Sequence, residues 1–160
     1  MTAFNFKFIA LTLIAAAIAA SAATAAAGIG WPVWAMFIGW VAFFTGDHTA
    51  KGALRSYLCV AIGIAFGTIA ALSVGTLIPM ISHFAFGVVV FFVAIVVVSL
   101  RAAPLLNNIP AYFLGLIAFF AAHVPPSLLA FGELAAVSGL GAFAALIAHR
   151  LQNKLARSVA

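Results

Sequence analysis

What this chain lacks most is charge. Only 6% of its 160 residues are Asp, Glu, Lys or Arg, whereas soluble domains typically carry about 25%. Hydrophobic residues make up 68%, and the mean hydropathy is +1.32. A water-soluble fold of this size cannot hide so much apolar surface, because small globules keep much of their surface wet. The composition therefore predicts one domain, residues 1–160, that is embedded in a lipid bilayer.

Cysteine and acidic residues are also scarce. The single Cys59 excludes an intramolecular disulfide. No spacing of His, Cys and carboxylate residues resembles a metal site, and neither a phosphate-binding glycine loop nor a nucleophile elbow is present. We therefore expect no enzymatic activity, no metal and no other cofactor. The net charge of +5 does not indicate nucleic-acid binding, because the basic residues are not clustered on one soluble face.

Long apolar runs are what the chain has instead. Six of them, separated by Pro, Gly and polar residues, cover about 8–28, 32–45, 52–77, 84–100, 110–123 and 126–149. A helix needs about 20 apolar residues to cross the bilayer, so the second and fifth runs are short. The runs are apolar on all sides, which favours helices over the alternating strands of a membrane barrel. We predict an all-α membrane protein with six transmembrane helices.

The basic residues support this count. Six crossings place all seven on one side of the membrane: Lys7, Lys51, Arg55, Arg101, Arg150, Lys154 and Arg157. Because short basic loops stay cytoplasmic, we expect a multi-pass protein of the bacterial inner membrane with both termini in the cytoplasm. One alternative concerns the first run. Lys7, the apolar stretch and the small-residue run ASAATAAA are also typical of a cleaved signal peptide.

The two short runs resemble each other. The segment AMFIGWVAFF (35–44) aligns without a gap on AYFLGLIAFF (111–120), and six of the ten positions are identical. Three helices separate the copies, so the second copy is inverted relative to the first. This predicts halves at about 8–77 and 84–149, related by a pseudo-two-fold axis in the membrane plane. Transporters often have such 3+3 inverted repeats, with solute sites near the midplane where the repeats meet.

These segments also resemble known families. The F-x-G-x-x-x-F-F pattern at 37–44, the polar loop with Lys51-Gly52 and the Gly-rich helix after it resemble the YcdZ-like proteins. These are small bacterial inner-membrane proteins that share a domain of unknown function. More distantly, WPVWAMFIGW and DHTAKGALR are similar to the membrane half of aromatic-acid and fusaric-acid exporters. Neither resemblance implies a particular binding residue.

Five residues are candidates for a solute pathway. Glu133 is the only acidic residue inside a predicted span, and such residues are costly and often functional. The alternative is a Glu133 that is simply hydrated near the periplasmic interface. His123 lies across the Pro-Pro corner, close enough in sequence to pair with Glu133, and Tyr57 occupies the matching position of the first repeat. The other two candidates are Gly39 and Gly115, the matching glycines of the short helices.

Two functions fit these features. The first is a small-solute channel or transporter, whose nearly charge-free interior suits a neutral or weakly ionised molecule. The second is a non-transporting subunit that binds a partner through small-residue faces on the first and third helices. These faces contain Ala16, Ala20, Thr24 and Gly28, and Gly63, Gly67, Ala71 and Gly75. Because six thin helices enclose little interior, we also expect a homo-oligomer, most simply a dimer.

Overall fold

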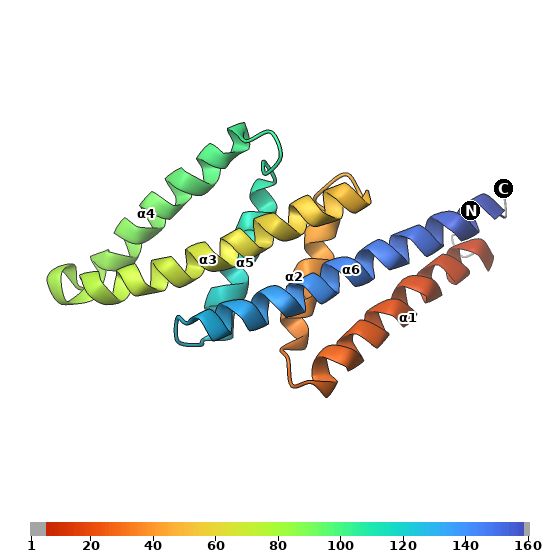
Figure 1. Cartoon of the computed structure of the whole chain (residues 1–160), viewed down its shortest axis with the longest axis horizontal. Helices are drawn as coiled ribbons and strands as arrows, with labels where there is room; N and C mark the ends of the chain where they lie inside the picture. Colours follow the sequence, from red (N-terminus) through yellow and green to blue (C-terminus); the bar gives the residue numbers. More distant parts are fainter. Residues whose placement is uncertain (1–5, 159–160) are drawn as a thin grey trace.

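The computed structural model describes residues 6–158, and this part of the chain contains helices and no strand (Figure 1). The expected all-α class is confirmed. The helices are α1 (Phe6–Gly28), α2 (Val33–Phe43), α3 (Ala50–Ile81), α4 (Phe84–Ser99), the short 3-10 helix η1 (Leu100–Ala102), α5 (Ile109–Ala122) and α6 (Leu128–Ser158).

The helices fall into two length classes. Four described segments are long and apolar enough to cross a bilayer: α1, α3, α6 and the continuous stretch Phe84–Ala102. The other two, α2 and α5, have 11 and 14 residues. At 1.5 Å per residue they rise about 17 and 21 Å, less than the roughly 30 Å of a hydrocarbon core. Length and composition thus establish four candidate spans, fewer than the six predicted.

The two longest helices correct the predicted boundaries. The sequence predicts 52–77 and 126–149, whereas α3 has 32 residues and α6 has 31. Pro79 lies inside α3 without ending it. At the other end, α6 continues through a segment rich in Lys, Arg and Gln, which are good helix formers. The polar C-terminal segment is therefore a continuation of the last helix.

Side-chain caps fix three of the helix starts. The Gly52 amide donates to the Thr49 hydroxyl (2.9 Å) at the start of α3. The Ala111 amide donates to the Asn108 side chain (3.3 Å) at the start of α5, and Ser127 accepts from an amide of α6 (3.1 Å). Ser, Thr and Asn are preferred at this position because they satisfy amides that lack a partner in the first turn.

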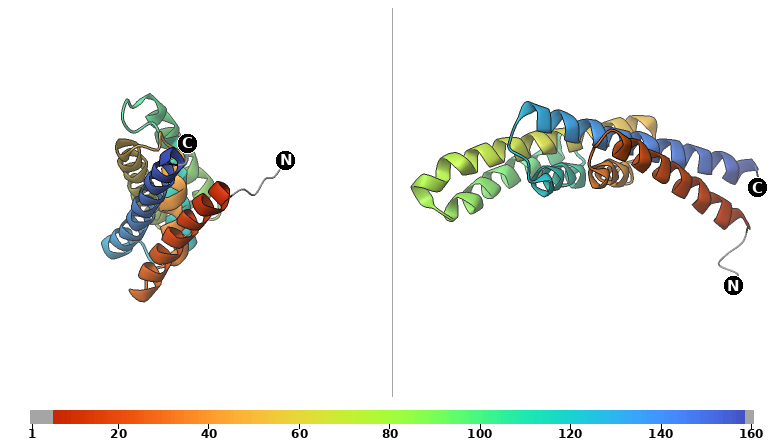
Figure 2. Two further views of the ribbon diagram at one scale, coloured as in Figure 1. Left: turned by 90° about the vertical axis from the view of Figure 1, so that its right-hand side faces the viewer. Right: turned by 90° about the horizontal axis from the view of Figure 1, so that it is seen from below.

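Each short helix packs mainly on the long helix of the opposite half of the chain. The most extensive helix contacts are α3 with α5 and α2 with α6. The peripheral helices complete the arrangement, since α1 lies along α6 and α4 lies along α3. Figure 1 shows α2 and α5 running in opposite directions, and Figure 2 shows them side by side and end-on. The halves are therefore interlocked at the centre of the molecule.

Glycines allow the backbones to touch where these helices cross. Gly39 of α2 lies against the backbone carbonyl of Ser138 in α6. Gly115 of α5 lies against the backbone carbonyl of Val60 in α3. A Cβ atom at either glycine would overlap that carbonyl oxygen. Small residues allow this kind of close approach between membrane helices.

The long helices contribute the reciprocal glycines. Gly63 of α3 meets the Tyr112 carbonyl, and Gly141 of α6 meets the Met36 carbonyl. The two crossings are therefore equivalent when Gly63 is paired with Gly141. The offset of 76 residues that aligns α2 with α5 instead pairs Gly63 with Gly139, which is two positions away from Gly141. The short helix α5 is three residues longer than α2, and the connection that follows it is one residue shorter, which together shift the long helices by two positions relative to the short ones.

The connections are sorted to two ends of the molecule. In Figure 1 the turns that follow α2 and α4 lie along the upper edge, and the start of α1 and the end of α6 lie at the right. The turns that follow α1 and α5 lie along the lower edge, and the turn that follows α3 lies at the far left. The first group holds every basic residue of the sequence. Within it, the Lys7 ammonium donates to the Ala156 carbonyl (3.0 Å), which ties α1 to α6.

Candidate functional site

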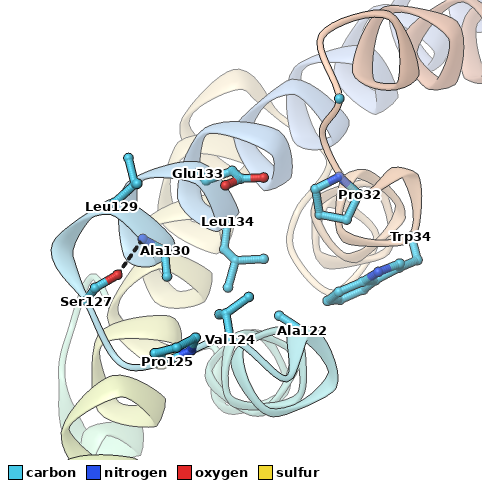
Figure 3. Close-up of a pocket in the computed structure, with 11 residues that line it drawn as sticks. Pro32, Trp34, Ala122, Val124, Pro125, Ser127, Leu129, Ala130, Glu133 and Leu134 are labelled. Atoms are coloured by element: carbon cyan, nitrogen blue, oxygen red, sulfur yellow. Dashed lines mark hydrogen bonds between the residues drawn. The ribbon is translucent and has the colours of Figure 1, made fainter.

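A pocket of about 470 Å³ lies at the end of the molecule that has no basic residue. It is formed by the α1–α2 turn, the end of α5 and the first turns of α6 (Figure 3). Its lining is mostly apolar and consists of Gly30, Pro32, Trp34, Ala122, Val124, Pro125, Ser127, Leu129, Ala130, Glu133 and Leu134. This cavity is called the Glu133 pocket below.

Glu133 is the only charged residue among those that line this pocket. Its side chain is partly buried, and its carboxylate points across the opening toward Pro32 (Figure 3). The Ser127 hydroxyl is already engaged, because it accepts from the Ala130 amide at the start of α6. The Trp34 indole at the opposite wall is the other side chain with a hydrogen-bond donor. The pocket thus presents one strong acceptor within an apolar surface.

His123 lies close to this pocket in sequence but does not line it. It ends α5 in the left-handed conformation (φ 52°), and its Nδ1 lies 2.8 Å from the Ala121 carbonyl oxygen. Its side chain is exposed. Within residues 6–158, no hydrogen bond or ion pair joins His123 to Glu133. The left-handed turn aims the imidazole along the backbone of its own helix.

Tyr57 is at a different place. Its ring lies over Gly139 on the other face of α6, with ring Cε2 3.1 Å from where a Cβ of residue 139 would be. The register of the long helices explains this, because the alignment set by the glycine crossings matches Glu133 with Arg55. The five predicted site residues are thus divided: Glu133 lines the pocket, Gly39 and Gly115 form the helix crossings, and the other two lie outside both.

The sequence prediction missed a polar cluster at the opposite end. The Asn108 amide group donates to the Thr45 hydroxyl (2.7 Å) and to the Ser56 hydroxyl (2.8 Å). Ser56 is 1% exposed. Nearby, the buried Tyr112 hydroxyl donates to the Leu106 carbonyl (2.9 Å). One side chain, that of Asn108, therefore connects the end of α2, the first turns of α3 and the start of α5. The sequence signal was an Asn just before a Pro-led helix, which is typical of a helix cap.

Asp47 lies next to this cluster, in the α2–α3 connection. Its carboxylate accepts from the Thr49 hydroxyl (2.7 Å) and from the Thr49 amide (3.1 Å). These bonds hold the pKa of the Asp47 carboxyl below its ordinary value, and the nearby positive charges of Arg55 and His48 act in the same direction. The carboxylate thus belongs to the turn that starts α3.

Among residues 6–158, no group of three or more His, Cys, Asp or Glu side chains is arranged to hold a metal ion. His48 and His149 come within 5.3 Å (ring centroids) at the end of the molecule that has the basic residues. Both rings pack against Phe43, each with a centroid separation of 5.6 Å. Aromatic packing at the end of α2 therefore accounts for the position of both imidazoles.

Fold and composition define the class: an all-helical protein with several long apolar helices compatible with a membrane. The chain belongs to the family described as "Protein of unknown function (DUF1097)", which matches residues 12–152. This agrees with the expectation of a family that has no assigned function, while the more specific YcdZ-like and exporter resemblances stay predictions. No curated protein and no solved structure matches the chain.

Proposed function

We propose that this protein is a six-span protein of the bacterial inner membrane that passes a small neutral or weakly ionised solute. Its two halves form an inverted repeat, and the solute enters through the Glu133 pocket. The observation that carries the proposal is the reciprocal glycine contact at the centre. Gly39 on Ser138 and Gly115 on Val60 repeat the same geometry between helices that run in opposite directions. Inverted repeats with short central helices are common in transporters.

The distribution of charge supports the orientation. All seven basic residues belong to the end of the molecule that includes the α2–α3 and α4–α5 connections. Basic residues near spans stay in the cytoplasm, so the Glu133 pocket opens to the periplasm. In this arrangement α2 and α5 cross the membrane at its centre, in the shelter of the longer helices. Both termini are cytoplasmic, although the terminal residues themselves lie outside the described range.

The pocket supports the solute class. One carboxylate among apolar walls offers a hydrogen-bond acceptor but no counter-charge for an anion. Because desolvating an unpaired charge is very costly, a fully ionised solute would bind poorly deeper inside, where the helix crossings offer no charged side chain. The two hydroxyls at the crossings, those of Ser138 and Tyr112, already donate to the carbonyls of Ala35 and Leu106. A small molecule with a hydrogen-bond donor is the solute that this surface favours.

The test is permeation into proteoliposomes. Purified protein in vesicles should accelerate the entry of glycerol, urea or acetamide over protein-free vesicles, measured by stopped-flow light scattering. Potassium chloride, the charged control, should enter no faster than through lipid alone. If none of these neutral solutes enters faster, the transport proposal for this class of solute fails.

Glu133→Gln tests the pocket itself. Loss of the charged acceptor should slow permeation by about ten-fold, the rate equivalent of roughly 1.4 kcal/mol of hydrogen bonding. Lys154→Gln is the matched control, because it removes a charge from the exposed end of the same helix. Equal rates for the wild type and the Glu133→Gln variant would remove Glu133 from the pathway.

A further inference from the structure

A second pocket, of about 320 Å³, lies at the opposite end of the molecule. It is formed by the end of α2, the start of α3 and the α4–α5 connection. Its lining residues are Thr45, Gly46, Asp47, Gly52, Arg55, Ser56, Leu105, Asn107, Asn108 and Pro110. This cavity is called the Arg55 pocket. It is more polar than the Glu133 pocket, because most of its lining side chains carry hydrogen-bonding groups.

The two pockets occupy equivalent places in the two halves. The alignment that superposes α2 on α5 at their glycine crossings matches Trp34 of the Glu133 pocket with Pro110 of the Arg55 pocket. The alignment that superposes α3 on α6 at the same crossings matches Arg55 with Glu133. Superposing the two halves therefore superposes the two pockets, and Arg55 takes the position that Glu133 has in the second half.

The Arg55 pocket offers both hydrogen-bond donors and hydrogen-bond acceptors, and its lining carries one positive and one negative charge. The exposed Arg55 guanidinium supplies several donors and a positive charge. Asp47 supplies a carboxylate, of which one oxygen accepts from Thr49 and the other has no hydrogen bond among the described residues. Asn108 forms the back wall, with its amide group already bonded to Thr45 and Ser56. A ligand would thus meet both a donor and an acceptor, with no net charge.

We propose that the Arg55 pocket is a second solute subsite, facing the cytoplasm, for a small uncharged molecule that carries both a hydrogen-bond donor and an acceptor, such as an amide. The inference rests on the proposed transport function and extends it to the inner face. The volume holds about ten water molecules at roughly 30 Å³ each, which limits the ligand to a similar number of non-hydrogen atoms. An amide satisfies Arg55 through its oxygen and Asp47 through its nitrogen.

The glycine crossings explain why two subsites are needed rather than one open pore. Along α2 and α6, the Glu133 pocket ends at Trp34 and Leu134, and the backbone contact of Gly39 with Ser138 follows about one turn deeper. The Arg55 pocket ends in the same way before the Gly115 contact. The two pockets share no lining residue.

Labelling of a single cysteine tests the subsite without relying on transport. Asn107→Cys in a Cys59→Ala background is treated with a membrane-impermeant sulfonated maleimide, in inside-out and in right-side-out vesicles. We expect labelling only in inside-out vesicles. Acetamide should slow that labelling by about two-fold when half of the pockets are occupied, and potassium chloride at equal osmolarity should not.

Two further variants serve as a replacement for Asn107→Cys and as a control outside the pocket. Leu105→Cys lines the same pocket and replaces Asn107→Cys if that protein does not fold. Lys154→Cys, on the same side but outside the pocket, should be labelled at a rate that acetamide does not change. Labelling from the periplasmic side, or inside labelling that acetamide leaves unchanged, overturns the subsite. Because this readout needs no permeation, it separates failure of the subsite from failure of the transport proposal.

Discussion

Residues without a side chain determine how closely the central helices approach. Gly39 and Gly115 each lie on a backbone carbonyl of the partner helix, and Gly63 and Gly141 complete the same two crossings. In the sequence the first two were candidates for lining a pathway, and in the structure they are contact points between backbones. Glu133, by contrast, lines a pocket at the start of α6.

Gly39→Ala should destabilise the protein. The added methyl group overlaps the Ser138 carbonyl, so α2 and α6 must separate, and overpacking of this kind typically costs about 1–3 kcal/mol. Gly87→Ala is the matched control, because a Cβ there meets nothing within 4 Å and alanine favours a helix interior over glycine. Thermal unfolding in detergent should show a lower midpoint for the first variant only. Equal midpoints would mean that α2 and α6 leave room for a methyl group between Gly39 and the Ser138 carbonyl.

At the scale of elements, one asparagine connects three helices. Asn108 begins α5, and its amide group reaches Thr45 after α2 and Ser56 within α3. The equivalent position in the other half is Pro32, which has no side-chain donor. At the Arg55 pocket, side-chain hydrogen bonds therefore join different helices, whereas the Ser127–Ala130 hydrogen bond at the Glu133 pocket lies within the start of α6.

Asn108→Ala should lower the free energy of unfolding by about 2 kcal/mol, because it removes two hydrogen bonds to hydroxyls and a cap, and Ser56 stays buried. Asn107→Ala, its exposed neighbour, is the control and should change little. The same unfolding measurement compares the two variants. If both lose stability equally, the loop backbone rather than the Asn108 side chain holds this end together.

The sequence could predict some elements and not their partners. Helical class, the two short helices and their Pro-led starts follow from long apolar runs and breakers. The exchanged packing of α2 on α6 and α5 on α3 could not be predicted, because helices that are apolar all round show no face that distinguishes lipid from protein. The two-position shift of the α3–α6 alignment relative to the α2–α5 alignment could not be predicted for the same reason. Moving an apolar helix along its axis by two residues leaves its hydrophobic pattern unchanged. The role of Asn108 could not be predicted either, because its hydroxyl partners are far away in the sequence.

At the scale of the whole molecule, the proposed function requires two inverted halves, each with one pocket at its own membrane face. The peripheral helices α1 and α4 lie on the outside of this arrangement, along α6 and α3. Many of their large apolar side chains are exposed, as expected for surfaces in lipid. The central claim is that the short helices α2 and α5 cross the membrane, because without those crossings the two pockets would not open on opposite sides.

Impermeant maleimide labelling on either side of each short helix tests this claim most directly. Single cysteines at Ile29 and His48 bracket α2, and those at Leu105 and Val124 bracket α5, all at exposed positions and all in the Cys59→Ala background. We predict that Ile29→Cys and Val124→Cys are labelled only from the periplasm, and that His48→Cys and Leu105→Cys are labelled only from the cytoplasm. Labelling of both positions around α2, or both around α5, from one face would contradict the inverted repeat and leave a four-span protein.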